Sequence, residues 1–176
     1  MKKIIIFIMA LVLVMASACT DTKNKPANVT EHEVTEKNDE KAELVLYYAS
    51  DDAMGLKAEV RSVPKDEATN PENVVNMLIS GTNEDGYASV IPNDTELNSC
   101  TVAGGVCTVD VSEEFVSRKG SANEQMIIYS VVNTLCRLDG IEKVKFLVDG
   151  KDVEFFGSYV FDEPFEEDTT LIKVGY

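Results

Sequence analysis

An uncharged apolar stretch covers residues 4–18, directly after two lysines and directly before Cys19. A short basic segment followed by an apolar one is typical of a secretory signal. The stretch is 15 residues long, whereas a membrane-spanning helix needs roughly 20 residues to cross the hydrocarbon core. The sequence therefore favours export over a permanent transmembrane anchor, and it separates this stretch from the part of the chain that can fold as a domain.

Small residues, Ala16-Ser17-Ala18, lead directly into Cys19. This pattern resembles the bacterial lipobox, in which the cysteine is diacylated and becomes the new N-terminus, although Ala16 stands where leucine is commonest. Two acyl chains make the double anchor that stable membrane attachment requires. We therefore predict a lipoprotein signal peptide over residues 1–18 and a diacylglyceryl group on Cys19, which holds the protein on the outer face of the cell membrane. The alternative is an ordinary signal cleaved after Ala18, which leaves Cys19 as a free or paired thiol.

The polar segment at residues 19–42 is a predicted disordered tether. Between Thr20 and Lys41 it contains no aromatic residue and only three aliphatic ones. Such a segment cannot bury enough apolar surface to offset the entropy lost on ordering. A flexible coil of this length would hold the domain that follows roughly 25 Å from the lipid.

The chain is strongly acidic, with a formal net charge of −15, and loss of Lys2 and Lys3 with the signal peptide would make it −17. A protein with this charge repels phosphate backbones, so nucleic acid is excluded as a partner. Cationic partners and loosely held divalent ions remain compatible with it.

Residues 43–176 alternate between strand-like and helix-like patterns, and their number suits a single domain. Two segments have the apolar period of a helix. One begins at Asn70-Pro71, an N-cap residue followed by proline, and the other at Ser121-Ala122-Asn123-Glu124, which has the form of a capping box. Gly81 and Asp139-Gly140 are their predicted ends.

Strand-like segments flank these helices in pairs. Gly104-Gly105 and Asp149-Gly150 are the predicted turns of two hairpins. In the second strand, Leu56, Ala58 and Val60 alternate with charged residues, which predicts a half-exposed strand paired with the first. The predicted strands are 44–49, 56–63, 99–102, 107–111, 144–148 and 153–155. The order β-β-α-β-β-α-β-β predicts an α+β fold, with two helices on one face of a mixed or antiparallel sheet.

Several short motifs then occur in an order typical of one family. They are Pro71, Leu78-Ile79-Ser80-Gly81, Ser89-Val90-Ile91-Pro92, the run GGVCTVDVS from Gly104 to Ser112, Glu124, Thr134-Leu135 and Val148-Asp149-Gly150. Together they resemble the GerMN domain of sporulation and germination proteins, over about residues 44–156. The resemblance implies a fold like the ring-building motifs of spore-envelope assemblies. It also implies a lipoprotein or membrane-tethered envelope protein with no established enzymatic activity.

Two polar residues of the GGVCTVDVS run, Asp110 and Ser112, stand opposite the apolar face of their predicted strand. Short polar residues at strand ends commonly bond to nearby backbone groups. We therefore expect them to cap the loop before the second helix, the alternative being contact with a partner at the surface.

Cys100 and Cys107 lie on the same face of one predicted hairpin, so they are candidates for a disulfide. With a two-residue turn at Gly104-Gly105 they sit diagonally, roughly 7–8 Å apart, at the limit for an unstrained bridge. A one-residue shift in register would place them face to face. The alternative is that both are small buried apolar residues, and Cys136 could also meet either of them in the core.

The sequence offers no set of catalytic residues. It has no G-x-S-x-G elbow, and its only histidine, His32, lies in the predicted tether. No C-x-x-C spacing suggests zinc, and no cofactor motif is present. The acidic runs 83–86 and 162–168 could hold calcium weakly, but neither has the ligand spacing of a dedicated loop. We therefore expect a protein that is not an enzyme.

Two functions remain in view. The first is assembly in the envelope or in a spore-related structure, through contacts with envelope proteins or by self-association. The second is binding of a cell-wall polymer or small ligand, as an accessory to a cell-wall hydrolase. The second requires an aromatic-lined pocket, and the chain has no Trp, 7 Phe and 6 Tyr.

Overall fold

A computed structural model of the protein describes residues 40–82, 84–117 and 121–173. The predicted signal peptide, the lipid attachment at Cys19, His32 and nearly all of the predicted tether lie outside these residues. The described chain opens with strand β1 (Lys41–Ser50), slightly before the predicted start of the domain. Residues 46–50 of β1 are all buried, as its continuous apolar character predicts.

The predicted order of strands and helices is confirmed, with several short elements added. In chain order after β1 the elements are β2 (Leu56–Pro64), α1 (Lys65–Ala68), α2 (Pro71–Ser80), β3 (Tyr87–Ala88), β4 (Leu97–Ala103), β5 (Val106–Val111), the 3-10 helix η1 (Glu113–Val116), α3 (Ser121–Leu135), β6 (Lys143–Val148), β7 (Lys151–Asp152), β8 (Phe155–Phe156), β9 (Tyr159–Val160), β10 (Phe165–Glu166) and the 3-10 helix η2 (Thr169–Leu171). The added elements are too short to carry a periodic pattern in the sequence.

The predicted start and end of the first helix are confirmed. The Asn70 side chain accepts a hydrogen bond from the amide of Glu72 at 2.9 Å, and Pro71 occupies the first turn of α2. Gly81 ends the helix with φ +80, a conformation that glycine adopts without strain. These local signals were sufficient to place α2.

The strands form two main sheets where a single sheet was expected. One has the order β2-β1-β3, the other has the order β10-β6-β5-β4 with β7 also paired to β6, and β8 and β9 form a separate hairpin. The pair β5–β6 is parallel and joined through α3, whereas the other pairs are antiparallel. The α+β class and the mixed sheet are therefore confirmed.

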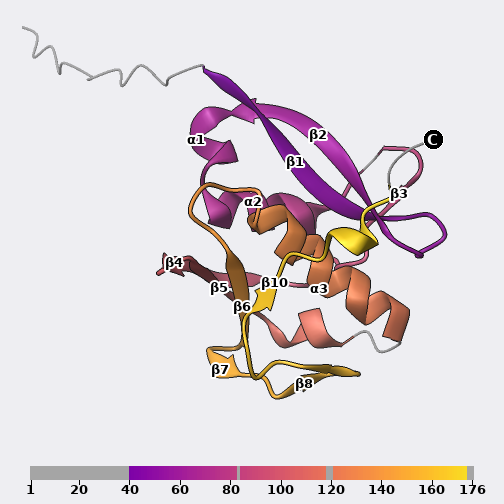
Figure 1. Ribbon diagram of the computed structural model, residues 1–176, viewed down its shortest axis with the longest axis vertical. Coiled ribbons are helices and arrows are strands. Elements are labelled where there is room, and N and C mark those ends of the chain that lie inside the picture. Colours follow the sequence, from indigo (N-terminus) through magenta and orange to yellow (C-terminus); the bar gives the residue numbers. More distant parts are fainter. Residues whose placement is uncertain (1–39, 83, 118–120, 174–176) are drawn as a thin grey trace, which may run out of the picture. The chain divides into compact units, whose positions relative to one another are not determined.

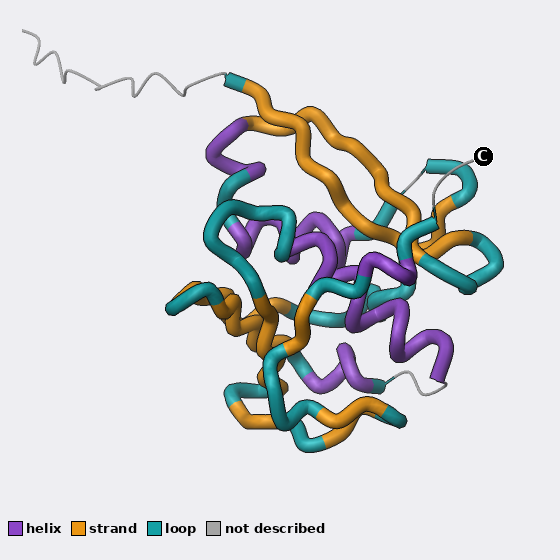
Figure 2. Tube along the Cα trace, in the orientation of Figure 1, coloured by secondary structure: helices purple, strands orange, loops and turns teal. Residues whose placement is uncertain are grey.

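The helices α2 and α3 lie between the two main sheets. Both contact β1, while α2 also packs on β4 and α3 on β6 and β10. Figure 1 shows the long β1–β2 ribbon on one side of the helices and β4, β5 and β6 on the other. The same succession of strands, helices and strands is visible in Figure 2. This arrangement gives the apolar stripe of α3 a core on two sides, which explains why residues 126–128 and 130–135 are all buried.

Leu56 is buried as predicted, but from Ala58 onward the faces of β2 are the reverse of its hydrophobic alternation. Val60 is 58% exposed, whereas the neighbouring Glu59 is only 8% exposed. Arg61, two residues on and therefore on the same face, donates from Nη2 to the carbonyl of Gly81 at 2.9 Å. The last carbonyls of a helix lack partners within it, so the C-terminus of α2 selects the polar face of β2.

A buried hydroxyl links the longest helix to the first strand. The Tyr47 amide donates to Thr134 Oγ1 at 2.9 Å, and Thr134 is fully buried. Thr134→Val keeps the shape of the side chain and removes the acceptor, which leaves the amide unpaired. We expect a loss of about 1–3 kcal/mol in the free energy of unfolding, measured by urea denaturation. Thr134→Ser keeps the acceptor and should retain slow hydrogen exchange at the Tyr47 amide. Equal unfolding curves for wild type and Thr134→Val would contradict this role.

Candidate interaction surface

Two large apolar side chains project side by side from the β8–β9 hairpin. Phe155 is 62% exposed and Val160 is 49% exposed, and the two residues are direct cross-strand partners. Side chains paired in this way lie on one face of a hairpin in mutual contact range. Phe155 and Val160 are together called the apolar patch below.

The apolar patch borders a shallow hollow with an acidic rim. The hollow has a volume of about 470 Å³ and is lined by Lys145, Asp152, Val153, Glu154, Phe155, Val160, Phe161 and Asp162. Three of these side chains are carboxylates and one is an ammonium, and Lys145 Nζ lies 2.6 Å from Asp152 Oδ1 in an ion pair. Apolar surface framed by negative charge suits a partner that combines apolar and basic side chains.

A cluster of buried aromatic rings supports the hairpin from below. Phe146 is in ring contact with Phe115, Phe161 and Phe165, at centroid distances of 5.5, 5.6 and 5.9 Å. Phe156, the neighbour of Phe155 in β8, turns inward and contacts Phe161 at 6.3 Å. The strand that carries Phe155 is therefore anchored in the core by the neighbouring Phe156. Through their contacts with Phe146, Phe161 and Phe165 attach the C-terminal segment to the body of the domain.

Glu124 fixes the turn of the hairpin. This buried carboxylate accepts a hydrogen bond from the Ser158 amide at 3.2 Å. A Cβ atom at Gly157 would collide with the same carboxylate, and Gly157 has φ +59. Glycine is therefore required at this turn. The predicted capping contact between Glu124 and Ser121 lies outside the described side chains.

The β8–β9 hairpin differs from the prediction. The sequence predicts residues 153–155 as the hairpin partner of β6, whereas the hairpin partner in the structure is β7, which covers only Lys151–Asp152. A signal was present, because Gly157-Ser158 separates Phe155-Phe156 from Tyr159-Val160, and a glycine-containing pair between strand formers is typical of a tight hairpin. Exposure of Phe155 could not have been read from the pattern, since alternation does not tell which face of a strand is buried.

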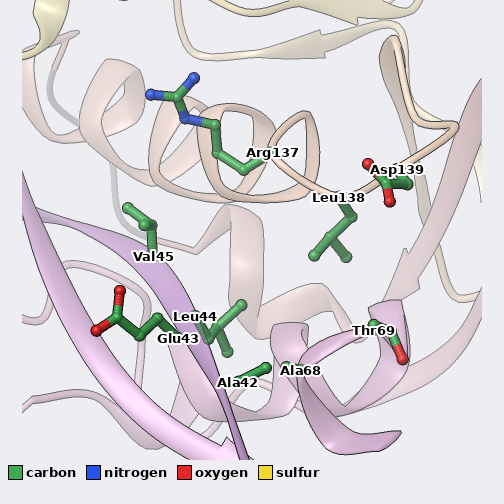
Figure 3. A pocket seen from close by; sticks show the side chains of 9 residues that line it. All are labelled: Ala42, Glu43, Leu44, Val45, Ala68, Thr69, Arg137, Leu138 and Asp139. Carbon is green, nitrogen blue, oxygen red and sulfur yellow. The ribbon is translucent and has the colours of Figure 1, made fainter. Parts of the chain in front are cut away.

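A second hollow, of about 440 Å³, lies beside the start of β1. Figure 3 shows its aliphatic side chains, among them Leu44, Ala68 and Leu138, with the Arg137 guanidinium extending away from them. None of its 9 lining residues is aromatic. Sugar rings usually stack on aromatic side chains, so this hollow does not fit a wall polymer.

A third hollow, of about 530 Å³, adjoins the polar face of β2 and is lined by Glu59, Val60, Arg61, Glu84 and Tyr87. Burial opposes ionisation of Glu59, but the Arg61 guanidinium and a hydrogen bond from Thr82 together outweigh this effect and lower the pKa of the carboxyl. Arg61 also donates to the hydroxyl of Tyr48 at 3.1 Å, which in turn lies 3.1 Å from the carbonyl of Met77. The arrangement holds the end of α2 in place, and Arg61 forms an ion pair with Glu59.

Burial raises the pKa of Tyr48 from 10.0 to about 12, although Arg61 acts in the opposite direction. Because the neutral hydroxyl is favoured in the folded state, its contribution is complete below pH 10 and is lost as the pH rises towards 12. We expect the free energy of unfolding to fall across this window by at most about 1.4 kcal/mol per pH unit. The measurement is the difference between wild type and Tyr48→Phe in chemical denaturation at each pH. An identical pH dependence in the two proteins would contradict it.

The cysteines adopt the diagonal register expected for a two-residue turn. Cys100 pairs with Val109 and Cys107 with Val102, and Gly104 and Gly105 have φ +57 and +82. The two sulfurs nevertheless lie 3.4 Å apart, as free thiols in hydrogen-bond contact. The right-handed twist of a hairpin shortens one of its diagonals, which accounts for the approach. Cys136 has a different hydrogen-bond partner, since its sulfur donates to the carbonyl of Glu142 at 3.5 Å.

The side chains of Asp110 and Ser112 accept hydrogen bonds from backbone amides next to neighbouring strands. Asp110 Oδ1 accepts from the amide of Gly150 at 2.9 Å, in the turn between β6 and β7. Ser112 Oγ accepts from the amide of Glu96 at 3.0 Å, just before β4. Both side chains therefore bond to backbone, as expected. The backbone that they serve is not the loop before the second helix, because the neighbouring strands lie closer.

The described part of the chain contains neither a cluster of metal-binding side chains nor a membrane-spanning helix. Residues 40–82, 84–117 and 121–173 contain no group of three or more His, Cys, Asp or Glu side chains that could hold a metal ion. In the same residues, no helix combines the length and apolar character needed to cross a bilayer.

Comparison with known proteins gives a consistent result. The Germane family, described as "Sporulation and spore germination", matches residues 45–154. The spore germination protein GerM of Bacillus subtilis (strain 168) is 28% identical over 145 residues, which cover 79% of this chain and 39% of that protein. The chain thus spans about two fifths of the length of this curated relative.

Solved structures share the fold of this chain. The tandem GerMN domains of the Bacillus subtilis sporulation protein GerM align with a TM-score of 0.59 and 25% identity, over 73% of this chain and 46% of that one. A protein from Clostridium perfringens, described as a candidate lipoprotein, aligns with a TM-score of 0.53 and 23% identity, over 72% of this chain and 87% of that one. The second likeness concerns the fold alone.

Proposed function

The chain belongs to the Germane family of sporulation and spore germination domains, and on that premise we propose that it is a lipid-anchored protein that acts in envelope or spore-related assembly by binding other proteins. The observation that carries the binding role is the apolar patch. A buried aromatic cluster holds Phe155 and Val160 in the exposed position described above. Exposed and adjacent large apolar residues on a firm base are typical of protein interaction sites.

The chemistry of the partner follows from the rim of the patch. Asp152, Glu154 and Asp162 line the hollow together with the apolar side chains, and Lys145 is the one cation among the lining residues. A second copy that presented the same face would bring like charges together, which costs free energy. We therefore infer a different protein as the partner, with an apolar side chain flanked by lysine or arginine. Self-association through this face is the competing outcome.

Anchoring at the membrane rests on the signal in the sequence. If Cys19 is acylated, Cys19→Ala should move the protein from the membrane fraction to the medium or leave it as an uncleaved precursor, because two acyl chains supply most of the membrane affinity. Cys136→Ala is the matched control and should leave the protein in the membrane fraction. Mass spectrometry of the native protein should find a diacylglyceryl group on Cys19. Unmodified Cys19 in a protein free in the medium would contradict the anchor.

Crosslinking in native membranes tests the binding role. A photo-reactive residue placed at Phe155 should give a discrete product with one protein of the host, which mass spectrometry identifies. The same group at Met54, an exposed apolar residue in the β1–β2 turn, is the control for non-specific capture. If the same set of crosslinked proteins formed from both positions, the apolar patch would not be a specific binding site. A product with twice the mass of the chain would replace the inferred partner by a second copy.

The alternative function is binding of a cell-wall polymer, as an accessory to a cell-wall hydrolase. Phe155 and Phe161 line the hollow beside the patch, so an aromatic surface exists for a sugar ring. Co-sedimentation with purified peptidoglycan separates the two functions. Retention that Phe155→Ala abolishes would favour the polymer, and no retention would remove this alternative.

A further inference from the structure

We propose that Cys100 and Cys107 form an oxidisable dithiol, which closes to an intrachain disulfide by exchange with a small-molecule or protein disulfide. The proposal rests on their geometry and does not depend on the function proposed above. The sulfurs are 3.4 Å apart, while a disulfide bond is about 2 Å long and requires Cβ atoms about 4 Å apart. The remaining gap can be closed by rotation about the Cα–Cβ bonds with a small approach of β4 and β5.

The two thiols differ in a way that assigns their order of reaction. Cys100 is half-buried and lies on β4, at the edge of the five-stranded sheet, whereas Cys107 is fully buried on β5. The hydrogen bond between them lowers the pKa of Cys100 and raises that of Cys107. Cys100 is therefore the thiolate that meets a reagent from solution, and Cys107 is the thiol that reacts second.

The exchange balances as two substitutions at sulfur. The Cys100 thiolate attacks one sulfur of an external disulfide, forms a mixed disulfide and releases the other half as a thiolate. Cys107 then passes its proton to a released thiolate or to water and attacks the Cys100 sulfur. This step forms the Cys100–Cys107 bond and expels the second half of the reagent. Two protein thiols have lost two electrons, and one external disulfide has been reduced to two thiols.

Cys136 is excluded from this chemistry by its surroundings. Burial raises the pKa of its thiol to about 11, and its sulfur donates to the Glu142 carbonyl. At neutral pH very little of it is thiolate, so it reacts slowly with disulfides. The odd cysteine of the domain therefore serves as an internal control.

Oxidised glutathione is the probe for the test. The reduced full chain, in mild detergent, is incubated across a series of ratios of oxidised to reduced glutathione, quenched with acid, unfolded, alkylated and digested with trypsin. No lysine or arginine lies between Lys65 and Arg118, so peptide 66–118 contains both Cys100 and Cys107, while peptide 120–137 contains only Cys136. As the ratio rises, we expect a growing fraction of peptide 66–118 to carry no alkyl group and to have a mass two hydrogen atoms below that of the unmodified peptide. Peptide 120–137 should carry its alkyl group throughout. Two alkyl groups on peptide 66–118 throughout the series, or a crosslink to Cys136, would overturn the proposal.

Single variants test the assigned order. Cys107→Ala should accumulate one glutathione on Cys100, because no second thiol can displace it. Cys100→Ala should leave Cys107 free of glutathione in the folded protein. The reverse pattern would overturn the order of reaction. If circular dichroism shows that a variant does not fold, the wild-type time course decides instead: a transient glutathione adduct on peptide 66–118 must precede the loss of two hydrogen atoms, and direct loss without an adduct would count against the mechanism.

Discussion

Phe146→Ala should lower the free energy of unfolding by about 3–5 kcal/mol, because a buried phenylalanine loses both its transfer free energy and its packing when it is cut to alanine. Phe146 is 2% exposed, and its ring contacts three other phenylalanines of the cluster. A domain of this kind has a total stability of about 5–15 kcal/mol, so the loss is a large fraction of it. Urea denaturation followed by circular dichroism provides the measurement.

Phe155→Ala is the matched control, since it removes the same atoms from an exposed position. We expect a change within about 0.5 kcal/mol, as for most surface substitutions. A loss at Phe155 as large as that at Phe146 would mean that the Phe155 ring is packed in the domain, and the apolar patch would then not be free to bind.

Phe155→Ala should also weaken binding of the partner identified by crosslinking, by at least about tenfold. Large aromatic side chains near the centre of an interface commonly contribute 2 kcal/mol or more when truncated. Binding of the purified partner is measured by titration calorimetry at two salt concentrations. Because the rim of the patch is acidic, affinity for a basic partner should fall as salt rises.

Val160→Ala and Val102→Ala form a control pair for the same experiment. Their side chains are similarly exposed, at 49% and 46%, and both lie in strands, but only Val160 belongs to the apolar patch. We expect a loss of affinity for Val160→Ala and none for Val102→Ala. Equal losses would point to a general effect of exposed apolar surface.

Local signals in the sequence were sufficient for α2 and for the turn at Gly104-Gly105. Asn70, Pro71 and Gly81 each act on backbone groups within a few residues, so the positions of α2 depend little on the rest of the fold. The turn at Gly104-Gly105, which sets the register of the cysteines, is of the same kind. The division of the strands into two sheets depends on pairing between distant segments, and no local pattern specifies it.

The orientation of β2 and the position of the patch were not predictable for a related reason. Alternation in β2 defines two faces, but the hydrogen bond from Arg61 to the Gly81 carbonyl at the end of α2 selects the face that turns inward. In β8 the short length leaves no alternation to read, and the buried aromatic cluster decides that Phe156 turns inward and Phe155 outward. In both strands a tertiary contact selected the face.

Hydrogen exchange of the domain with and without its crosslinked partner shows whether the patch is the binding surface. We expect amides within residues 152–162 to exchange more slowly in the complex, with little change in β4 (Leu97–Ala103), an edge strand that carries none of the patch residues. Slower exchange confined to β4 or to the β1–β2 ribbon, with residues 152–162 unchanged, would contradict binding through Phe155 and Val160.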